Sequence, residues 1–165
     1  MGKQMGDDKT NHGNGQEANA LLAAAKAQAK AQGKNVFLIF HASWCGPCFA
    51  LRQFLNGPQV KPLIDSHYVV LEEDVFEKEK NGWENPGGQA LFKQYGGTGV
   101  IPFYAILDPS GKKIGDSIVN SENMGMPFNT ATVNSFVGLI RATASGLTEG
   151  ELARIGDALR QLIRG

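Results

Sequence analysis

The chain has 165 residues, enough for one domain with a substantial hydrophobic core but short for two. Its 16 Lys and Arg residues balance 16 Asp and Glu residues, so the formal charge at pH 7 is zero. Without a basic excess, neither nucleic acid nor an anionic membrane surface is expected as a partner. No apolar stretch approaches the length of a transmembrane helix, and we expect a monomer without a membrane span.

We predict that residues 1–17 form a flexible N-terminal tail and that residues 18–165 form a single domain. The tail is rich in Gly, Asn, Asp and Lys and lacks the apolar core of a secretory signal. Two compartments remain open: a periplasmic or otherwise exported protein whose signal peptide has been removed, and a cytoplasmic protein. His12 in the tail has no neighbouring ligand residues, so no metal is expected there.

The domain begins with a helix and a buried strand. Apolar side chains recur at helical spacing from Ala18 to Ala29, and Gly33 ends this helix. The run VFLIF, residues 36–40, has the length and the β-branched and aromatic content of a strand buried on both faces. Residues 47–56 then predict a second helix with proline in its first turn.

The sequence WCGPC, residues 44–48, joins this strand to the second helix and contains the only two cysteines of the chain. Cys45 falls at the start of the helix, where free N–H groups and the positive end of the helix dipole favour a thiolate. We therefore expect the pKa of this thiol to lie below its usual value. The spacing lets Cys45 attack a disulfide and lets Cys48 resolve the mixed disulfide, which predicts a redox-active pair that needs no further cofactor.

With WCGPC after a buried strand, the chain resembles the thioredoxin family, whose active-site motif it matches at residues 44–48. A second segment, GVIPF at residues 99–103, resembles the part of that family that carries a cis-proline facing the cysteines. The resemblance implies an α/β thioredoxin fold, in which helices flank a central mixed sheet. It also implies a cis peptide bond before Pro102 and a substrate strand lying along the backbone of Ile101.

The resemblance extends to the residues around the cysteines. Trp44 would shield the site, and Gly46 and Pro47 would fix the geometry of its turn. Two positions depart from thioredoxin proper, which has a buried proton-transferring aspartate where this chain has Ile39 and a tryptophan where it has His41. The HASWCGPC context is more similar to the exported and interchange-type branches of the superfamily. His41 is interpreted either as a proton acceptor for the thiols or as a packing residue.

A strand predicted at residues 68–74 ends in three acidic side chains. If it runs parallel to the first strand, its end lies at the same edge of the sheet as the cysteines. Glu72, Glu73 or Asp74 is then a hypothetical proton relay in place of the missing aspartate. The alternative is an ordinary solvated strand end.

Two connections of the remaining chain, residues 76–88 and 117–128, are rich in turn residues and are predicted to be irregular, with their roles left open. Thr148 and Glu151 form a capping box before an additional C-terminal helix within residues 145–165. The other predicted elements are a short helix at 59–66, a helix at 88–95, a strand at 103–107, an antiparallel edge strand at 113–116 and a helix around the apolar stripe Val133, Phe136, Val137 and Ile140.

These observations predict an enzyme that reduces or isomerises protein disulfides. Its partners would be protein disulfide substrates and an unidentified electron-donor or electron-acceptor protein. Two alternatives stay open: an oxidising folding factor, and a non-catalytic binding or chaperone module with the same fold. A zinc site would need two more ligands, and the chain has no second CxxC motif, so no metal is expected.

Overall fold

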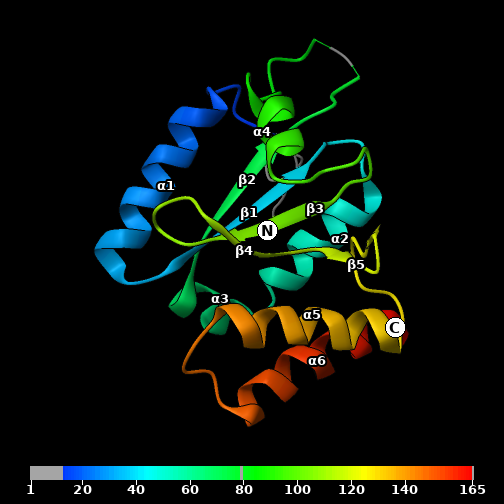
Figure 1. Cartoon of the computed structure of the whole chain (residues 1–165). Coiled ribbons are helices and arrows are strands. Elements are labelled where there is room, and N and C mark those ends of the chain that lie inside the picture. Colours follow the sequence, from blue (N-terminus) through cyan, green and yellow to red (C-terminus); the bar gives the residue numbers. More distant parts are fainter. Residues whose placement is uncertain (1–12, 79, 165) are drawn as a thin grey trace.

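A four-stranded mixed sheet forms the centre of the computed structural model, which describes residues 13–78 and 80–164 (Figure 1). The strand order is β2-β1-β3-β4. β1 and β2 run parallel, whereas β3 is antiparallel to β1 and β4 is antiparallel to β3. This is the α/β thioredoxin fold that the resemblance implies. The strands are β1 (Asn35–His41), β2 (Tyr68–Asp74), β3 (Phe103–Leu107) and β4 (Lys113–Asp116).

Helices cover both faces of the sheet (Figure 1). The helices α1 and α4 pack on one face, and α2, α3, α5 and α6 contribute to the core on the other. The bounds of the helices are α1 (Ala18–Gln32), α2 (Gly46–Leu55), α3 (Lys61–His67), α4 (Gly88–Gln94), α5 (Thr130–Thr143) and α6 (Glu149–Arg164).

Strand β1 is buried on both faces, as its continuous apolar run predicts. Phe37 and Ile39 face the layer that contains α2, while Val36, Leu38 and Phe40 face α1 and α4. Each is at most 2% exposed. Since burying a large apolar side chain contributes roughly 1.5–3 kcal/mol, β1 is firmly anchored up to the point where the cysteine loop begins.

The additional C-terminal helix is α6, and it begins behind the predicted capping box. Thr148 accepts the N–H of Glu151 through its hydroxyl at 3.1 Å, and Glu151 accepts the N–H of Thr148 through its carboxylate at 2.9 Å. The buried Leu152, Ile155 and Leu159 then join the core beside α5. The helix is thus an integral part of the packed domain.

The connection over residues 117–128 is less irregular than predicted. It contains a small antiparallel hairpin of β5 (Ile118–Val119) and β6 (Glu122–Asn123). The two residues between the strands, Asn120 and Ser121, have φ angles of 51° and 68°. Such left-handed pairs are typical of tight hairpin turns, although Asn-Gly is the pair that usually signals them.

Part of the tail predicted over residues 1–17 is folded. The N–H of Gly13 donates to the carboxylate of Asp74 at 2.8 Å, and the following residues hydrogen bond to the connection behind β2. Residues 13–17 therefore lie against the domain, in contrast to the tail predicted for them. Residues 1–12, including His12, lie outside the part of the chain that the structure describes.

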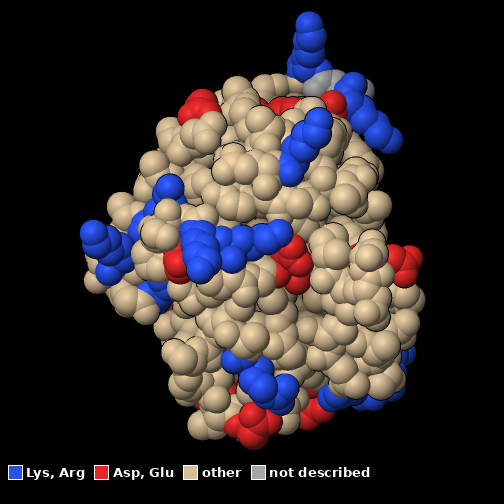
Figure 2. All heavy atoms as spheres, in the orientation of Figure 1, with Lys and Arg blue, Asp and Glu red and all other residues tan. Residues whose placement is uncertain are grey.

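Charged side chains are dispersed over the face of the molecule drawn in Figure 2. Lys and Arg lie in several separate groups, with Asp and Glu between them and a broad uncharged area around them. This face therefore carries no continuous basic surface of the kind that binds the phosphate backbone of a nucleic acid. Among the helices of residues 13–78 and 80–164, none has both the length and the apolar character needed to cross a bilayer.

Candidate active site

Cys45 and Cys48 form a disulfide at the N-terminus of α2. Both side chains are 4% exposed, and their Cα atoms are 5.2 Å apart. Cys45 caps the helix, because its Sγ accepts the N–H of Cys48 at 3.2 Å. Pro47 lies in the first turn, where its missing N–H costs no helical hydrogen bond. In the reduced protein, a thiolate at Cys45 would keep this donor and would lie at the positive end of the helix dipole.

A tight turn carries the chain from β1 to Cys45. The carbonyl of the fully buried Ala42 accepts the N–H of Cys45 at 3.1 Å, so Ser43 and Trp44 form the two central positions of the turn. Gly46 follows with open space beside it, since a β-carbon there would meet no atom within 4 Å. The surrounding structure therefore leaves room for a larger side chain than glycine at this position.

The predicted cis-proline segment lies against the disulfide. The peptide bond between Ile101 and Pro102 is cis, as the resemblance implies. The carbonyl oxygen of Ile101 lies 3.8 Å from Sγ of Cys45, and Pro102 is buried. The amide of Asn123 in β6 donates to the carbonyls of Val100 and Pro102, at 2.9 Å each. Asn123, which sequence reasoning missed, thus holds the backbone on both sides of Ile101.

The connection behind β2 contacts the turn before Cys45. The indole N–H of Trp44 donates to the carbonyl of Phe76 at 2.7 Å, and Nζ of Lys78 lies 4.5 Å from the centroid of the Trp44 ring. The carboxylate of Glu77 accepts the N–H of Ser43 at 2.8 Å and its hydroxyl at 2.7 Å. Trp44 remains 47% exposed, so it lies beside the disulfide and also faces solvent.

His41 is buried at the end of β1, on the face of the sheet that α2 covers. Its side chain is 3% exposed. Burial lowers the pKa of His41 below its usual value, although the nearby carboxylate of Glu72 acts in the opposite direction. A neutral imidazole is the form that a proton acceptor requires. The hydrogen bonds of the described residues do not join this ring to either cysteine, so both interpretations of His41 stay open.

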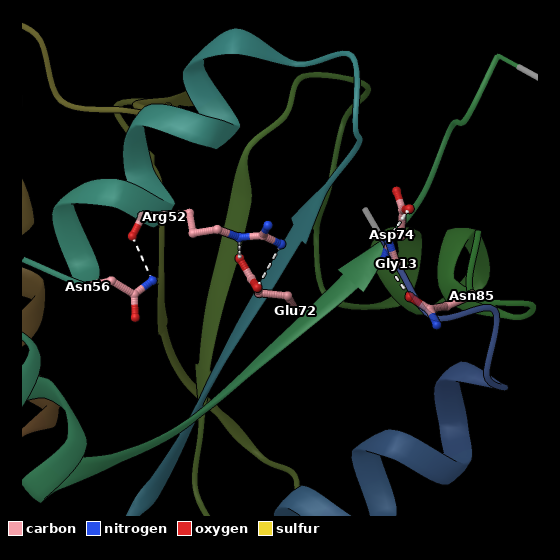
Figure 3. Close-up of polar contacts among 6 residues, drawn as sticks. All are labelled: Gly13, Arg52, Asn56, Glu72, Asp74 and Asn85. Atoms are coloured by element: carbon pink, nitrogen blue, oxygen red, sulfur yellow. Dashed lines mark hydrogen bonds and ion pairs between the residues drawn. The ribbon is translucent and has the colours of Figure 1, made fainter. Parts of the chain in front are cut away.

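The three acidic residues of β2 have different environments. Glu72 pairs in register with Ile39 and accepts two hydrogen bonds from the guanidinium of Arg52, at 2.9 Å each (Figure 3). Arg52 lies one helical turn after Cys48, on α2. A charged pair therefore occupies the side of the sheet where thioredoxin proper has its buried aspartate.

Glu73 and Asp74 are completely buried, so the alternative of a solvated strand end is wrong for both. Glu73 pairs in register with Phe40, which faces α1, and neither of its carboxyl oxygens has a hydrogen-bond partner among the described residues. Burial raises the pKa of Glu73 to about 8.

Asp74 accepts the N–H of Gly13, and its own N–H donates to Asn85 at 2.6 Å (Figure 3). Burial, followed by the interaction with Glu77, raises the pKa of Asp74 to about 8. Within the described chain, no hydrogen bond joins any acidic residue of β2 to a cysteine. The relay stays a hypothesis.

A hollow of about 570 Å³ near Arg52 and Glu72 is lined mostly by polar side chains of α1, α2, α3 and β2, but by neither cysteine. In residues 13–78 and 80–164, no group of three or more His, Cys, Asp and Glu side chains is arranged to hold a metal ion.

Comparison with known sequences links the chain to disulfide chemistry. A protein-family model described as "Thioredoxin-like" matches residues 17–109. The chain is 34% identical over 106 residues to thiol:disulfide interchange protein DsbD 1 of Pseudomonas aeruginosa, covering 62% of this chain and 16% of that protein. It is 39% identical over 59 residues to thiol:disulfide interchange protein DsbD of Vibrio cholerae, covering 35% of this chain and 10% of that protein. The chain thus spans less than a fifth of the length of both relatives.

Comparison with solved structures supports the fold. The disulphide isomerase from Xylella fastidiosa Temecula1 superposes with a TM-score of 0.54 at 22% identity. The match covers 88% of this chain and 90% of the isomerase, so α5 and α6 do not prevent a match along nearly the whole chain.

Proposed function

Because the chain belongs to the thioredoxin-like family, we propose that it is a thiol–disulfide oxidoreductase that reduces or isomerises protein disulfides. The observation that carries this proposal is the Cys45–Cys48 disulfide at the N-terminus of α2, where Cys45 accepts a main-chain N–H. The names of the Pseudomonas aeruginosa and Vibrio cholerae relatives, both thiol:disulfide interchange proteins, support the same chemistry.

In the proposed reduction, the thiolate of Cys45 attacks one sulfur of a substrate disulfide, RS–SR′. A new S–S bond forms between Sγ of Cys45 and the sulfur of RS as the substrate S–S bond breaks, and R′S⁻ leaves and takes a proton from water. The thiolate of Cys48 then attacks Sγ of Cys45, the S–S bond between Cys45 and the sulfur of RS breaks, and RS⁻ leaves. Two electrons have passed to the substrate, and the Cys45–Cys48 disulfide remains. In isomerisation, a substrate thiolate displaces Cys45 instead, so no net electrons are transferred.

The surface beside the disulfide supports a polypeptide substrate. The backbone of Ile101 borders Cys45, and the exposed apolar side chains of Trp44, Phe49 and Val100 belong to the segments around the cysteine pair and the cis-proline. A substrate strand along Ile101 and its neighbour Pro102 would bring its disulfide to the Cys45 sulfur by main-chain contacts, which tolerate varied side chains.

Repeated reduction needs a source of electrons. We assign this role to a partner protein with a dithiol, which would reduce the Cys45–Cys48 disulfide by the same exchange in reverse. An exported location agrees with the interchange-type context of the cysteine motif, and a cytoplasmic location is the alternative. An oxidising folding factor would use the same residues with the opposite electron flow, and the reduction potential of the pair distinguishes the two directions.

A trapping experiment tests the proposal. In Cys48→Ser, the substrate should remain attached to Cys45 as a mixed disulfide that a reductant releases, because the resolving thiol is absent. In Cys45→Ser, little mixed disulfide should form. Non-reducing electrophoresis with a disulfide-containing protein such as insulin reads out both variants. Equal trapping by the two variants would overturn the assigned roles, and trapping by neither would favour the non-catalytic module.

A further inference from the structure

Three consecutive residues behind β2 hold the two central residues of the turn before Cys45. Phe76 accepts the indole N–H of Trp44 through its carbonyl, and Lys78 lies over the Trp44 ring. Between them, Glu77 binds both the N–H and the hydroxyl of Ser43. Two short hydrogen bonds to a carboxylate are charge-assisted and are stronger than neutral ones. The turn is therefore held from outside by a segment more than thirty residues away in the sequence.

The backbone of this segment adopts an unusual conformation. Phe76 has a φ angle of 59°, in the left-handed region that side chains other than glycine rarely adopt. Its ring packs edge-on against Phe92 of α4, with 5.1 Å between the ring centroids. Such backbone conformations persist where surrounding contacts hold them, and they concentrate at functional sites. Here the conformation accompanies the contacts that the next residue, Glu77, makes with the turn.

Glu77 is itself held in place. Its N–H donates to the carboxylate of Glu84 at 3.1 Å, and the amide of Asn81 donates to its carboxylate at 3.3 Å. Burial acts to raise the pKa of Glu77, but hydrogen bonds from Asp74, Ser43 and Asn81 outweigh it and lower this pKa. Glu77 is therefore a carboxylate at neutral pH, and it presents fixed acceptors to the turn.

We propose that Glu77 is a positioning residue for the nucleophilic Cys45. By fixing Ser43, Glu77 fixes the turn that ends at Cys45, and so keeps the sulfur where it accepts the N–H of Cys48. This inference rests on the proposed thiol–disulfide exchange, since only a reacting thiolate gains from such placement. Glu77 does not touch the sulfur, and its effect passes through the turn.

The test measures the Cys45 thiol directly, in a Cys48→Ser background where it is the only cysteine of the chain. Glu77→Ala removes both hydrogen bonds and should slow alkylation of Cys45 by iodoacetamide at pH 7 about tenfold, with a raised pKa in the 240 nm titration. Glu77→Gln keeps an acceptor for the Ser43 N–H and a donor for its hydroxyl, and should stay within about twofold of the parent. Glu122→Ala, a charge removal in the other connection, should change neither quantity.

Each outcome decides the proposal. If Glu77 acted only through its charge, both Glu77 variants would react faster than the parent, because removal of a nearby negative charge favours the thiolate. If it only supported the fold, Glu77→Ala would lower the melting temperature and leave the rate and the pKa unchanged. Either result overturns the positioning role. Failure of the wild type to reduce insulin would overturn the proposed function instead, and the alkylation measurements remain independent of it.

Discussion

Two connections contact the segments that flank the disulfide, and they use different chemistry. The connection over residues 75–87 reaches the turn before Cys45 through the charged carboxylate of Glu77. The connection over residues 117–128 reaches the cis-proline segment through the neutral amide of Asn123. The first contacts the segment that carries the nucleophile, and the second contacts the segment proposed to receive the substrate. We infer that thiol reactivity and substrate binding are supported by separate parts of the chain.

The two connections should also differ in how they respond to pH. Asp74, the last residue of β2 before the first connection, is buried beside Glu77 and has a pKa raised to about 8. In the second connection, Asn123 accepts the hydroxyl of Ser117 at 2.7 Å, and this hydroxyl also accepts the N–H of Tyr104. Neither Asn nor Ser titrates near neutral pH. The first connection should therefore respond to pH between neutral and about 9, whereas the second should not.

The largest expected effect is on stability. The pKa values of Glu73 and Asp74 rise on folding from 4.5 and 3.8 to about 8. Between these limits the unfolded chain releases protons that the folded chain retains, so the free energy of unfolding should fall as the pH rises and level off above about 8. We expect a loss of several kcal/mol between pH 5 and pH 8, summed over the two groups. Urea unfolding monitored across this range measures it.

Two variants separate the contributions of Asp74 and Glu73 to the fall of the unfolding free energy with pH. Asp74→Asn reproduces the protonated side chain, because its oxygen can accept the N–H of Gly13 and its amide can donate to Glu77. Glu73→Gln likewise removes the other titrating group. Each should flatten the dependence on pH in part, and the double variant should nearly abolish it. An unchanged slope in the double variant would show that the buried acids do not cause it.

A smaller effect is expected at the second connection. Asn123→Ala removes the donor that holds the carbonyls of Val100 and Pro102, and should lower kcat/KM for a protein disulfide about tenfold through KM. Alkylation of Cys45 in the Cys48→Ser background should stay close to that of the parent. A variant that slowed alkylation as much as Glu77→Ala does would contradict the separation between the two connections.

Local sequence patterns predicted the elements that carry the cysteines. The run VFLIF is the buried strand β1, and the pattern around Pro47 places the start of α2 beside Cys45. The capping box at Thr148 is also present. These features depend on residues a few positions apart, so a single sequence contains their signal. The cis bond before Pro102 came from the family resemblance, since position alone does not distinguish a cis from a trans proline.

The contacts around the site could not be predicted in the same way. Ser43 and Glu77 are 34 residues apart, and Val100 and Asn123 are 23 apart, with no local pattern to link them. Glutamate in a polar loop usually remains solvated, so the composition of this segment did not single out Glu77. The burial of Glu73 was equally hidden, because an acidic strand end ordinarily faces water.

Single-turnover transfer of electrons tests the central claim most directly. The protein would be reduced, freed of reductant and mixed with an excess of insulin, and its thiols and those of insulin would be counted by mass spectrometry after quenching. We predict that each molecule regains its Cys45–Cys48 disulfide as one insulin disulfide becomes two thiols, and that Cys45→Ser transfers no electrons. A wild-type protein that keeps both thiols reduced, or a Cys45→Ser variant that performs the same exchange, would contradict the account.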